Sequence, residues 1–358
     1  MKKIAFVTRV FSSGGAENVL RQIVEFCASK DMESLIIAVQ EGAHASFSPT
    51  VEVRELKDTH GGITGKLSQY RQVRRIVKDF GAELVLSMPE DIGIYVILAM
   101  LGTGIPVVVS ERNNPWVMPN KKITRLLRKV SYPFAAGLIF QTEQAMSFFP
   151  RYLQNKGIVL DNPLDLTRLP EPVSSDRKKQ IVSAGRLDDQ KNFPLLITAF
   201  AIFHQKHPQY QLVIYGEGRK RAELEVLAKK LLPDEAWSMP GRVTDLPQKM
   251  AQCEMFVLSS DYEGVPNVLI EAMACGLPVV STDCAPGGAA HLIDPGKNGL
   301  LVPVGNAAAL AEGMMFFAEH PQEAAQMGRN AAGLRQRMDA NHVAAQWLKY
   351  LQEIGCKE

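Results

Sequence analysis

The sequence lacks the features that mark secreted, membrane-spanning and metal-binding proteins. Only 5 of its 358 residues are cysteine, and they are scattered along the chain without a C-x-x-C pair. This usage favours a reducing compartment and gives no thiolate zinc site. The 7 histidines form no ligand cluster. No apolar run approaches the roughly 20 residues of a membrane-spanning helix, and the run at Ile4–Val7 is too short for the core of a signal peptide.

A strong charge of either sign is also missing, because the net charge is only +2. Residues 1–170 carry 21 Lys and Arg against 16 Asp and Glu, so the first half is modestly basic. A weak positive surplus suits an anionic acceptor or a membrane surface, but it is too small to indicate nucleic-acid binding, and no nucleic-acid motif is present. We therefore expect a cytoplasmic protein, which could lie peripherally on the inner face of the plasma membrane.

The pattern of elements predicts an α/β protein with two Rossmann-like domains. Short apolar runs of strand length alternate with helical segments along the whole chain, which indicates parallel sheets. The expected strands are 4–10, 35–39, 51–56, 84–87, 106–110, 137–141 and 158–160 in the first domain, and 180–183, 211–215, 255–258 and 278–280 in the second. We expect domains at 1–165 and 166–340, a last segment at 341–358, and linker sequence at 161–163 and 170–175.

The most informative stretch is residues 255–283, MFVLSSDYEGVPNVLIEAMACGLPVVSTD. It begins with the strand and continues through a polar loop into a helix over 267–275. Pro266 is expected as the first helical residue, where its missing N–H costs nothing. Gly276 and Pro278 end the helix and lead into the next strand. This pattern is one strand–helix–strand unit of a parallel sheet.

Two carboxylates flank the start of that helix. Glu263 lies in the loop before it, and Glu271 lies one to two turns inside it. The backbone N–H groups of Asn267, Val268 and Leu269 would present a partial positive charge suited to a phosphate. A nucleotide-sugar bound there would place a ribose beside one carboxylate and a sugar beside the other. The alternative is a helix whose acidic residues have no ligand.

The string EGVPNVLIEAMACGLPVV closely resembles the signature of glycosyltransferase family 4. The resemblance implies the GT-B architecture, in which two Rossmann-like domains face each other across a central cleft. It also implies that the second domain binds a nucleotide-sugar and that the first binds the acceptor. In this family Glu271 would hold the ribose hydroxyls, and Glu263 would contact the transferred sugar.

A second string, GRLDDQKNFPLLITAF, resembles another signature of the same family. Arg186 and Lys191 lie in one strand-to-helix loop, where two cations could clamp a diphosphate or could simply be surface charges. The resemblance implies that both bind the donor phosphates and stabilise the leaving group. Gly216 follows the strand 211–215, where a glycine lets the backbone approach a ligand. Arg242 and Val243 stand where the family holds the nucleotide base.

In the first domain, a strand, a glycine loop with Gly14 and Gly15, and a helix form a phosphate-accepting element or a turn that merely packs. The resemblance implies that both glycines face the donor diphosphate and the acceptor. Glu90 follows the strand 84–87, at the end where ligands sit in open α/β sheets. Arg112 stands where many relatives carry a histidine, so it would bind a phosphate of donor or acceptor and this loop would supply no general base.

The segment KKITRLLRKV, residues 121–130, predicts a basic amphipathic helix. Ile123, Leu126, Leu127 and Val130 share one face, and basic residues surround the rest. Such a helix can lie on an anionic membrane. Alternatively, it is a surface helix whose apolar face belongs to the core.

The resemblance implies a retaining glycosyltransferase that needs no metal ion and no cofactor. The expected donor is a UDP-sugar, and the expected acceptor is a glycan or a polyprenyl-diphosphate-linked glycan of surface polysaccharide biosynthesis. Two alternatives remain open. A nucleotide-sugar isomerase of the 2-epimerase type would share the architecture, and a nucleotide-sugar-binding protein could share the donor site without catalysis.

Overall fold

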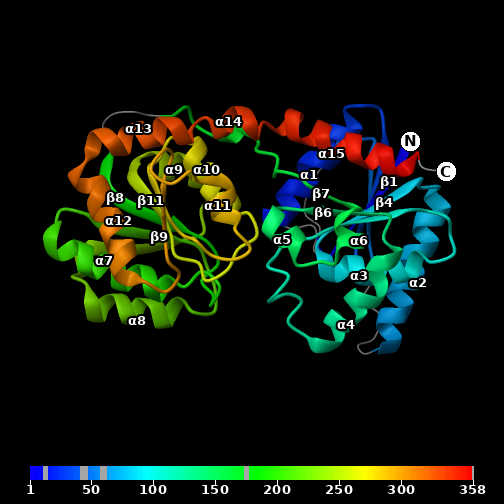
Figure 1. Cartoon of the computed structure of the whole chain (residues 1–358), viewed down its shortest axis with the longest axis horizontal. Helices are drawn as coiled ribbons and strands as arrows, with labels where there is room; N and C mark the ends of the chain where they lie inside the picture. The colour runs from blue at the N-terminus through cyan, green and yellow to red at the C-terminus, as the bar shows by residue number, and fades with distance from the viewer. Residues whose placement is uncertain (11–14, 41–46, 57–62, 173–176, 357–358) are drawn as a thin grey trace. The chain divides into compact units, whose positions relative to one another are not determined.

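The computed structural model describes residues 1–10, 15–40, 47–56, 63–172 and 177–356. They form two compact units, Met1–Pro163 with Ala340–Glu358 and Leu164–Asp339 (Figure 1). Two residues of the predicted linker, Pro170 and Glu171, belong to the second unit instead. The guanidinium of Arg335 donates to the carbonyl of Pro170 at 2.9 Å and binds the carboxylate of Glu171 at 2.7 Å.

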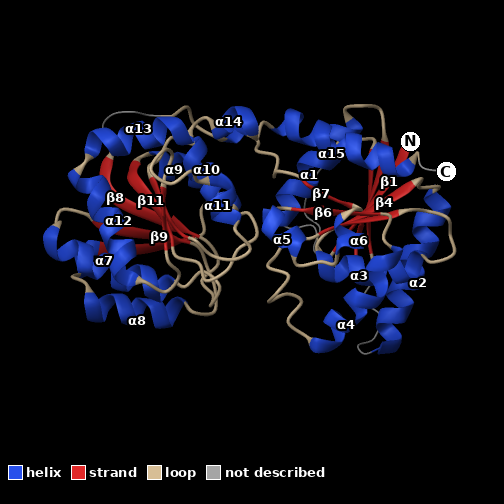
Figure 2. Ribbon diagram, in the orientation of Figure 1, coloured by secondary structure: helices blue, strands red, loops and turns tan. Residues whose placement is uncertain are grey.

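The first unit is built on a seven-stranded parallel sheet (Figure 2). The strand order is β3-β2-β1-β4-β5-β6-β7, and every neighbouring pair is parallel. The strands are β1 (Lys3–Thr8), β2 (Glu33–Ala38), β3 (Val51–Glu55), β4 (Leu84–Ser87), β5 (Val107–Ser110), β6 (Gly137–Phe140) and β7 (Gly157–Val159).

Helices cover both faces of this sheet, as the alternation of β1 side chains shows. Ile4 and Phe6 pack among residues of α1 and α15, whereas Ala5 and Val7 pack among residues of α2 and α3. Burial on both faces explains why inner strands such as β4 and β5 are mostly apolar in sequence, whereas the edge strand β3, VEVRE, is largely exposed. The helices are α1 (Gly15–Ala28), α2 (Ile63–Phe80), α3 (Glu90–Met100), α4 (Lys122–Ser131), η1 (Tyr132–Phe134), α5 (Glu143–Ser147), α6 (Arg151–Gln154) and α15 (Ala340–Gly355).

The last helix, α15, belongs to the first unit although it ends the described chain. Its Trp347 is fully buried and donates its indole N–H to the carbonyl of Asp161 at 3.0 Å. The hydroxyl of Tyr350 donates to the carbonyl of Lys156 at 2.6 Å. Gly137 of β6 leaves the space for this ring, because a Cβ atom there would lie 2.4 Å from the tyrosine oxygen.

The second unit repeats the plan with six parallel strands in the order β10-β9-β8-β11-β12-β13. Its strands are β8 (Lys178–Ala184), β9 (Gln211–Tyr215), β10 (Trp237–Gly241), β11 (Cys253–Leu258), β12 (Val279–Thr282) and β13 (Leu300–Val302). Ile181 of β8 points to one face, toward α7, α8 and α12, and Val182 points to the other, toward α9, α10 and α11. The α/β class with two parallel, Rossmann-like sheets is therefore confirmed.

The helices of the second unit are α7 (Phe193–Lys206), α8 (Arg221–Leu231), α9 (Leu246–Ala251), α10 (Asn267–Ala274), α11 (Gly288–Leu292), α12 (Ala307–Glu319), α13 (Pro321–Ala331) and α14 (Leu334–Arg337), with the short turns η2 (Leu166–Arg168) and η3 (Asp234–Ala236). One boundary differs from the prediction. Pro266 is not the first helical residue of α10 but its N-cap, with an extended backbone at φ −76° and ψ 112°. None of the described helices is long and apolar enough to cross a bilayer.

Candidate functional site

The candidate site lies in the second unit, where the strand order of its sheet reverses. β8 and β11 are neighbours in the sheet, and from them the chain order runs outward in opposite directions. In an open parallel sheet, the loops at the carboxyl ends of two such strands diverge and leave a crevice in which ligands bind. These loops are residues 185–192 after β8 and residues 259–266 after β11.

An ion pair between Lys191 and Glu263 joins the two loops. The Lys191 Nζ atom lies 2.6 Å from the Glu263 Oε1 atom, and both side chains are largely buried. The same oxygen accepts a hydrogen bond from the Ser260 hydroxyl at 2.8 Å, and the Oε2 atom accepts one from the Gln190 amide at 3.2 Å. The structure thus brings together two of the predicted site residues, each contacting the other.

Further hydrogen bonds fix the two loops against each other. The Ser259 hydroxyl donates to the carbonyl of Lys191 at 2.8 Å, and the Asp261 N–H donates to the carbonyl of Gln190 at 2.9 Å. Asn192 donates its amide to the Asp261 carboxylate at 2.7 Å and caps α7 by accepting from the Leu195 N–H. Asn192 has φ of 43°, a left-handed conformation that asparagine tolerates better than most residues. The loops therefore form a preorganised unit.

Glycines make this packing possible, and one of them, Gly216, is a predicted site residue. The stem of Lys191 crosses Gly185, where a Cβ atom would lie 2.7 Å from the lysine Cε atom. Gly216 was predicted to let the backbone approach a ligand. In the structure it approaches the neighbouring loop, because a Cβ atom there would lie 1.8 Å from the carbonyl oxygen of Gly185. Packing alone thus requires glycine at position 216.

Arg186 is exposed, with 78% of its side chain accessible. Its guanidinium lies 3.6 Å from the Asp188 carboxylate and 3.5 Å from the Gln190 side-chain oxygen. Gln190 therefore links Arg186 to Glu263, since its amide nitrogen contacts that carboxylate. Gln190 and Ser260 were not predicted as site residues, although both lie inside or beside the motifs. A neutral polar side chain in a sequence does not by itself indicate a binding or catalytic role.

Glu271 lies on α10 in a partly buried position. Burial raises the pKa of its carboxyl to about 7, and the charge of Arg168 only partly opposes this. No described side chain or backbone group donates a hydrogen bond to its carboxylate. The N-terminus of α10 has no side-chain cap. Of the three residues predicted there, Leu269 donates its N–H to the carbonyl of Pro266, and the Val268 N–H has no acceptor among the described residues.

Arg242 and Val243 lie farther out in the sheet. They directly follow β10, the edge strand, whose last residue Gly241 has φ of 86° and accepts a hydrogen bond from the Gly216 N–H at 2.9 Å. The strands expected from the sequence did not include β10. Their assignment to a nucleotide base stays a prediction.

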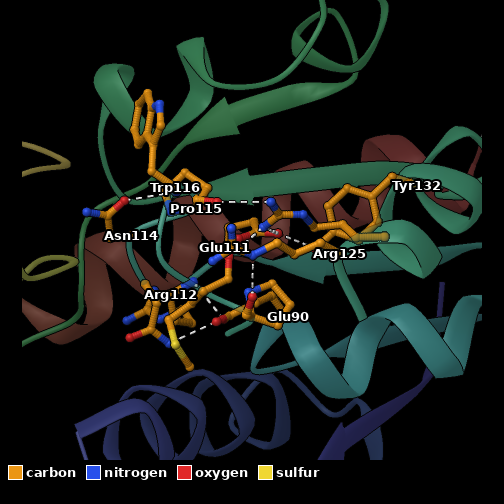
Figure 3. A network of polar contacts seen from close by, with 12 residues as sticks. Glu90, Glu111, Arg112, Asn114, Pro115, Trp116, Arg125 and Tyr132 are labelled. Atoms are coloured by element: carbon orange, nitrogen blue, oxygen red, sulfur yellow. Dashed lines mark hydrogen bonds and ion pairs between the residues drawn. The ribbon is translucent and has the colours of Figure 1, made fainter. Parts of the chain in front are cut away.

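Two of the predicted residues of the first unit, Glu90 and Arg112, are buried. Gly14 lies outside the described residues, and Gly15 is the first residue of α1. Glu90 is 2% exposed, and its carboxylate accepts from the Arg112 N–H at 3.3 Å and from the Asn113 amide at 2.9 Å (Figure 3). Burial raises the pKa of Glu90. Contact with an acceptor would require this carboxylate to become exposed.

Arg112 is also buried, but its guanidinium is only partly satisfied. Its Nη2 atom donates to the Asn162 side-chain oxygen at 2.7 Å. Its Nε and Nη1 atoms are buried and have no hydrogen-bond partner among the described residues. Burial lowers the pKa of Arg112 to about 10, and Glu90 opposes this shift. Unpaired buried N–H groups are costly, so two of them favour an anion as the missing partner.

Comparison with known proteins relates these motifs to one family. The model for "Glycosyl transferases group 1" matches residues 168–333, which include Arg186, Lys191, Glu263 and Glu271. This stretch of the chain resembles the group 1 glycosyltransferases. Among the described residues, no group of three or more His, Cys, Asp and Glu side chains is placed to hold a metal ion.

Two glycosyltransferases are similar to this chain over almost their whole length. The chain is 27% identical to GalNAc-α-(1→4)-GalNAc-α-(1→3)-diNAcBac-PP-undecaprenol α-1,4-N-acetyl-D-galactosaminyltransferase of Campylobacter jejuni, over 99% of each chain. It is 28% identical to N-acetylgalactosamine-N,N'-diacetylbacillosaminyl-diphospho-undecaprenol 4-α-N-acetylgalactosaminyltransferase of the same organism, over 98% of this chain and 100% of that one. The crystal structure of HepE from Anabaena in complex with UDP-glucose has a TM-score of 0.84 at 22% identity, over 98% of this chain and 99% of HepE. This likeness establishes the GT-B fold.

Proposed function

We propose that the chain transfers a sugar from a UDP-sugar to a polyprenyl-diphosphate-linked glycan, with retention at the anomeric carbon and without a metal ion. The observation that carries the proposal is the linked set Arg186–Gln190–Glu263–Lys191 at the crevice of the second sheet. The names of the two Campylobacter jejuni relatives, which both specify an undecaprenol-linked acceptor, support the acceptor class. The complex of HepE with UDP-glucose supports the donor class.

In this proposal the cations hold the donor diphosphate. A lysine ammonium has three N–H donors, and Glu263 occupies one, so two remain for phosphate oxygens. Arg186 has most of its guanidinium free of contacts and can bind the same diphosphate as a fork. Negative charge grows on the diphosphate as the bond to the sugar breaks, so both contacts strengthen in the transition state.

Glu263 has a double role in this account. Its carboxylate positions the Lys191 ammonium, and it accepts three hydrogen bonds from described residues out of about four that a carboxylate can accept. The remaining lone pair is available to a hydroxyl of the transferred sugar. Glu271, whose carboxylate has no donor in the described part of the chain, accepts hydrogen bonds from the ribose hydroxyls. In the first unit, the unpaired N–H groups of Arg112 bind a phosphate oxygen.

The chemical step needs no protein base. The acceptor hydroxyl attacks the anomeric carbon on the face from which the diphosphate leaves, and its proton passes to the leaving diphosphate oxygen. One glycosidic bond forms, one bond between sugar and phosphate breaks, and UDP is released. This accounts for a loop at Arg112 that carries no histidine.

The test is to incubate the protein with a panel of UDP-sugars, with and without an undecaprenyl-diphosphate-linked glycan, and to measure UDP release and product formation. We expect UDP release that depends on the acceptor. Conversion of the UDP-sugar into an isomer without transfer would instead identify a 2-epimerase. Tight UDP-sugar binding without any turnover across the panel would identify a binding protein.

A further inference from the structure

The basic helix α4 packs with its polar side inward and its apolar side outward. Its buried residues are Thr124, Arg128 and Ser131. Ile123, Leu126 and Val130 are 59%, 56% and 52% exposed, and Phe134, which continues the same face into η1, is 59% exposed. Of the face that the sequence predicted, only Leu127 packs against the core. The interpretation of α4 as a surface helix with its apolar face in the core is therefore wrong.

A buried polar network holds the helix in this orientation. Arg128 is 4% exposed, and its guanidinium donates to the carbonyls of Met118 at 2.9 Å and Pro115 at 3.0 Å. It lies 3.9 Å from the carboxylate of Glu111. The Tyr132 hydroxyl also bonds to Glu111, so the C-terminal half of α4 and the adjoining turn η1 are both tied to the residue that follows β5 (Figure 3). Arg128 also stacks on the rings of Phe148 and Phe149, 4.9 and 5.2 Å from their centres.

Burying an arginine while apolar side chains stay in water lowers the stability of the fold. This loss of stability indicates that the outward face has a function. A buried arginine requires every contact of its network, whereas an apolar residue in its place would need none. Four large apolar side chains remain in water on one contiguous face, and clustered exposure of this kind marks an interaction surface. We call Ile123, Leu126, Val130 and Phe134 the outer apolar face.

The charges around this face select its partner. From Arg112 to Thr142 the sequence contains no Asp or Glu. Lys121, Lys122 and Lys129 are exposed on α4, and none of them has an ion-pair partner among the described residues. An apolar stripe with unpaired lysines beside it is complementary to a surface that has an apolar interior and negatively charged groups at its contact with water.

The helix α8 of the second unit provides the contrast. It also exposes apolar and basic residues, with Val226 at 69% and Leu231 at 39% exposure, next to Lys229 and Lys230. However, α8 carries Glu223 and Glu225, and its acidic side chains pair with Lys220 and Arg221. Exposed apolar and basic side chains therefore occur on both helices. What distinguishes α4 from α8 is that α4 has no acidic residue.

We propose that the outer apolar face of α4, with Lys121, Lys122 and Lys129, docks the protein onto the surface of an anionic phospholipid bilayer. The apolar side chains enter the boundary between headgroups and acyl chains, and the lysines bind lipid phosphates. This deepens the proposed function, on which it rests for its purpose, because a polyprenyl-linked acceptor is presented at a membrane.

The experiment is flotation of the full-length protein with vesicles of phosphatidylglycerol and phosphatidylcholine in equal parts, compared with vesicles of phosphatidylcholine alone. We expect binding to the anionic vesicles that weakens in high salt. The triple variant I123S/L126S/V130S should bind at least roughly tenfold more weakly. The variant K121Q/K122Q/K129Q should lose about fivefold for each lysine, hence roughly a hundredfold in total.

The matched control is V226S/K229Q/K230Q on α8, which should float like the wild type. Equal loss in this control, equal binding to both kinds of vesicle, or no binding at low salt would each overturn the proposal. A wild-type dimer that becomes monomeric in I123S/L126S/V130S, with vesicle binding unchanged, would show that the face binds protein instead. Melting temperatures of all variants check that they are folded.

Failure of this proposal can be distinguished from failure of the proposed function. Flotation is measured without donor, and UDP release is measured with a water-soluble acceptor and without vesicles. We expect I123S/L126S/V130S to keep its UDP release in that assay. If the protein releases UDP normally but does not float with the vesicles, only the docking proposal is refuted. If it floats but releases no UDP, only the proposed function is refuted.

Discussion

Replacing Glu271 by glutamine should stabilise the free protein and weaken UDP binding at the same time. Burial raises the pKa of this carboxyl from 4.5 to about 7. Between these two values the unfolded chain is ionised while the folded one holds a proton, so stability falls as the pH rises. Above pH 7 the carboxylate is charged, and the full penalty of about 3 kcal/mol follows from 1.36 kcal/mol per pKa unit. Glutamine cannot ionise and removes this penalty.

The same substitution removes the proposed acceptor of the ribose hydroxyls. A buried hydrogen bond to a charged group contributes about 1.5–3 kcal/mol, so the affinity for UDP should fall at least tenfold. Because only the ionised carboxylate serves as acceptor, the wild type should bind UDP about tenfold more weakly at pH 6 than at pH 8. The variant should lack this part of the pH dependence, and measuring both side by side subtracts the titration of the ligand.

The assays are urea unfolding at pH 5 and pH 8 and calorimetry with UDP. The matched control is Glu312→Gln, which changes an exposed carboxylate on α12 and should alter neither quantity. Glu271→Gln should gain more stability at pH 8 than at pH 5. If it binds UDP as tightly as the wild type at pH 8, the ribose assignment is wrong. If its stability is unchanged at pH 8, the carboxylate has a partner that this account lacks.

The remaining predictions concern the diphosphate, the paired carboxylate and the metal. Arg186→Ala and Lys191→Ala should each lower kcat by roughly 10²-fold with the fold retained, because each removes a donor to the developing charge; near-normal turnover would remove the clamp from the mechanism. Glu263→Gln should lower kcat and kcat/KM together, since it frees the ammonium and loses a sugar contact; unchanged kcat with weaker UDP binding would reverse the roles of the two glutamates. Arg112→Gln should raise KM for the phosphate-bearing substrate that it binds, and an unchanged KM for both substrates would refute the phosphate role. Turnover should persist in EDTA, and its complete loss with recovery in Mn²⁺ would contradict a metal-free mechanism.

The architecture was predictable because the inner strands are buried on both faces. The strand Leu84–Ser87 is buried throughout and apolar except for its last residue, and the helical segment after it returns the chain to a parallel position, so local pattern is enough. Where local pattern and tertiary packing disagree, the prediction was incomplete. β10, Trp237–Gly241, has the sequence WSMPG and is an edge strand that pairs with β9. Its proline and glycine are uncommon inside strands, so the sequence did not predict a strand there.

The candidate site was predictable in its residues but not in its contacts. The motifs placed Lys191 and Glu263 in two different loops, but the distance of 2.6 Å between their charged atoms depends on β8 and β11 being neighbours. The reason for Gly216 lies in a backbone oxygen 31 residues away in sequence, that of Gly185. The orientation of α4 was not predictable either, because the partners of Arg128 come from Glu111 and from carbonyl groups of a loop.

The central claim is retaining transfer from a UDP-sugar to a lipid-linked glycan. The most direct measurement is the anomeric configuration of the new linkage, determined by NMR on product made from an α-configured UDP-sugar and an undecaprenyl-diphosphate-linked glycan, together with the amount of UDP released. The account predicts an α-linkage and one UDP for each linkage formed. A β-linked product, or UDP release without a new linkage, would contradict it.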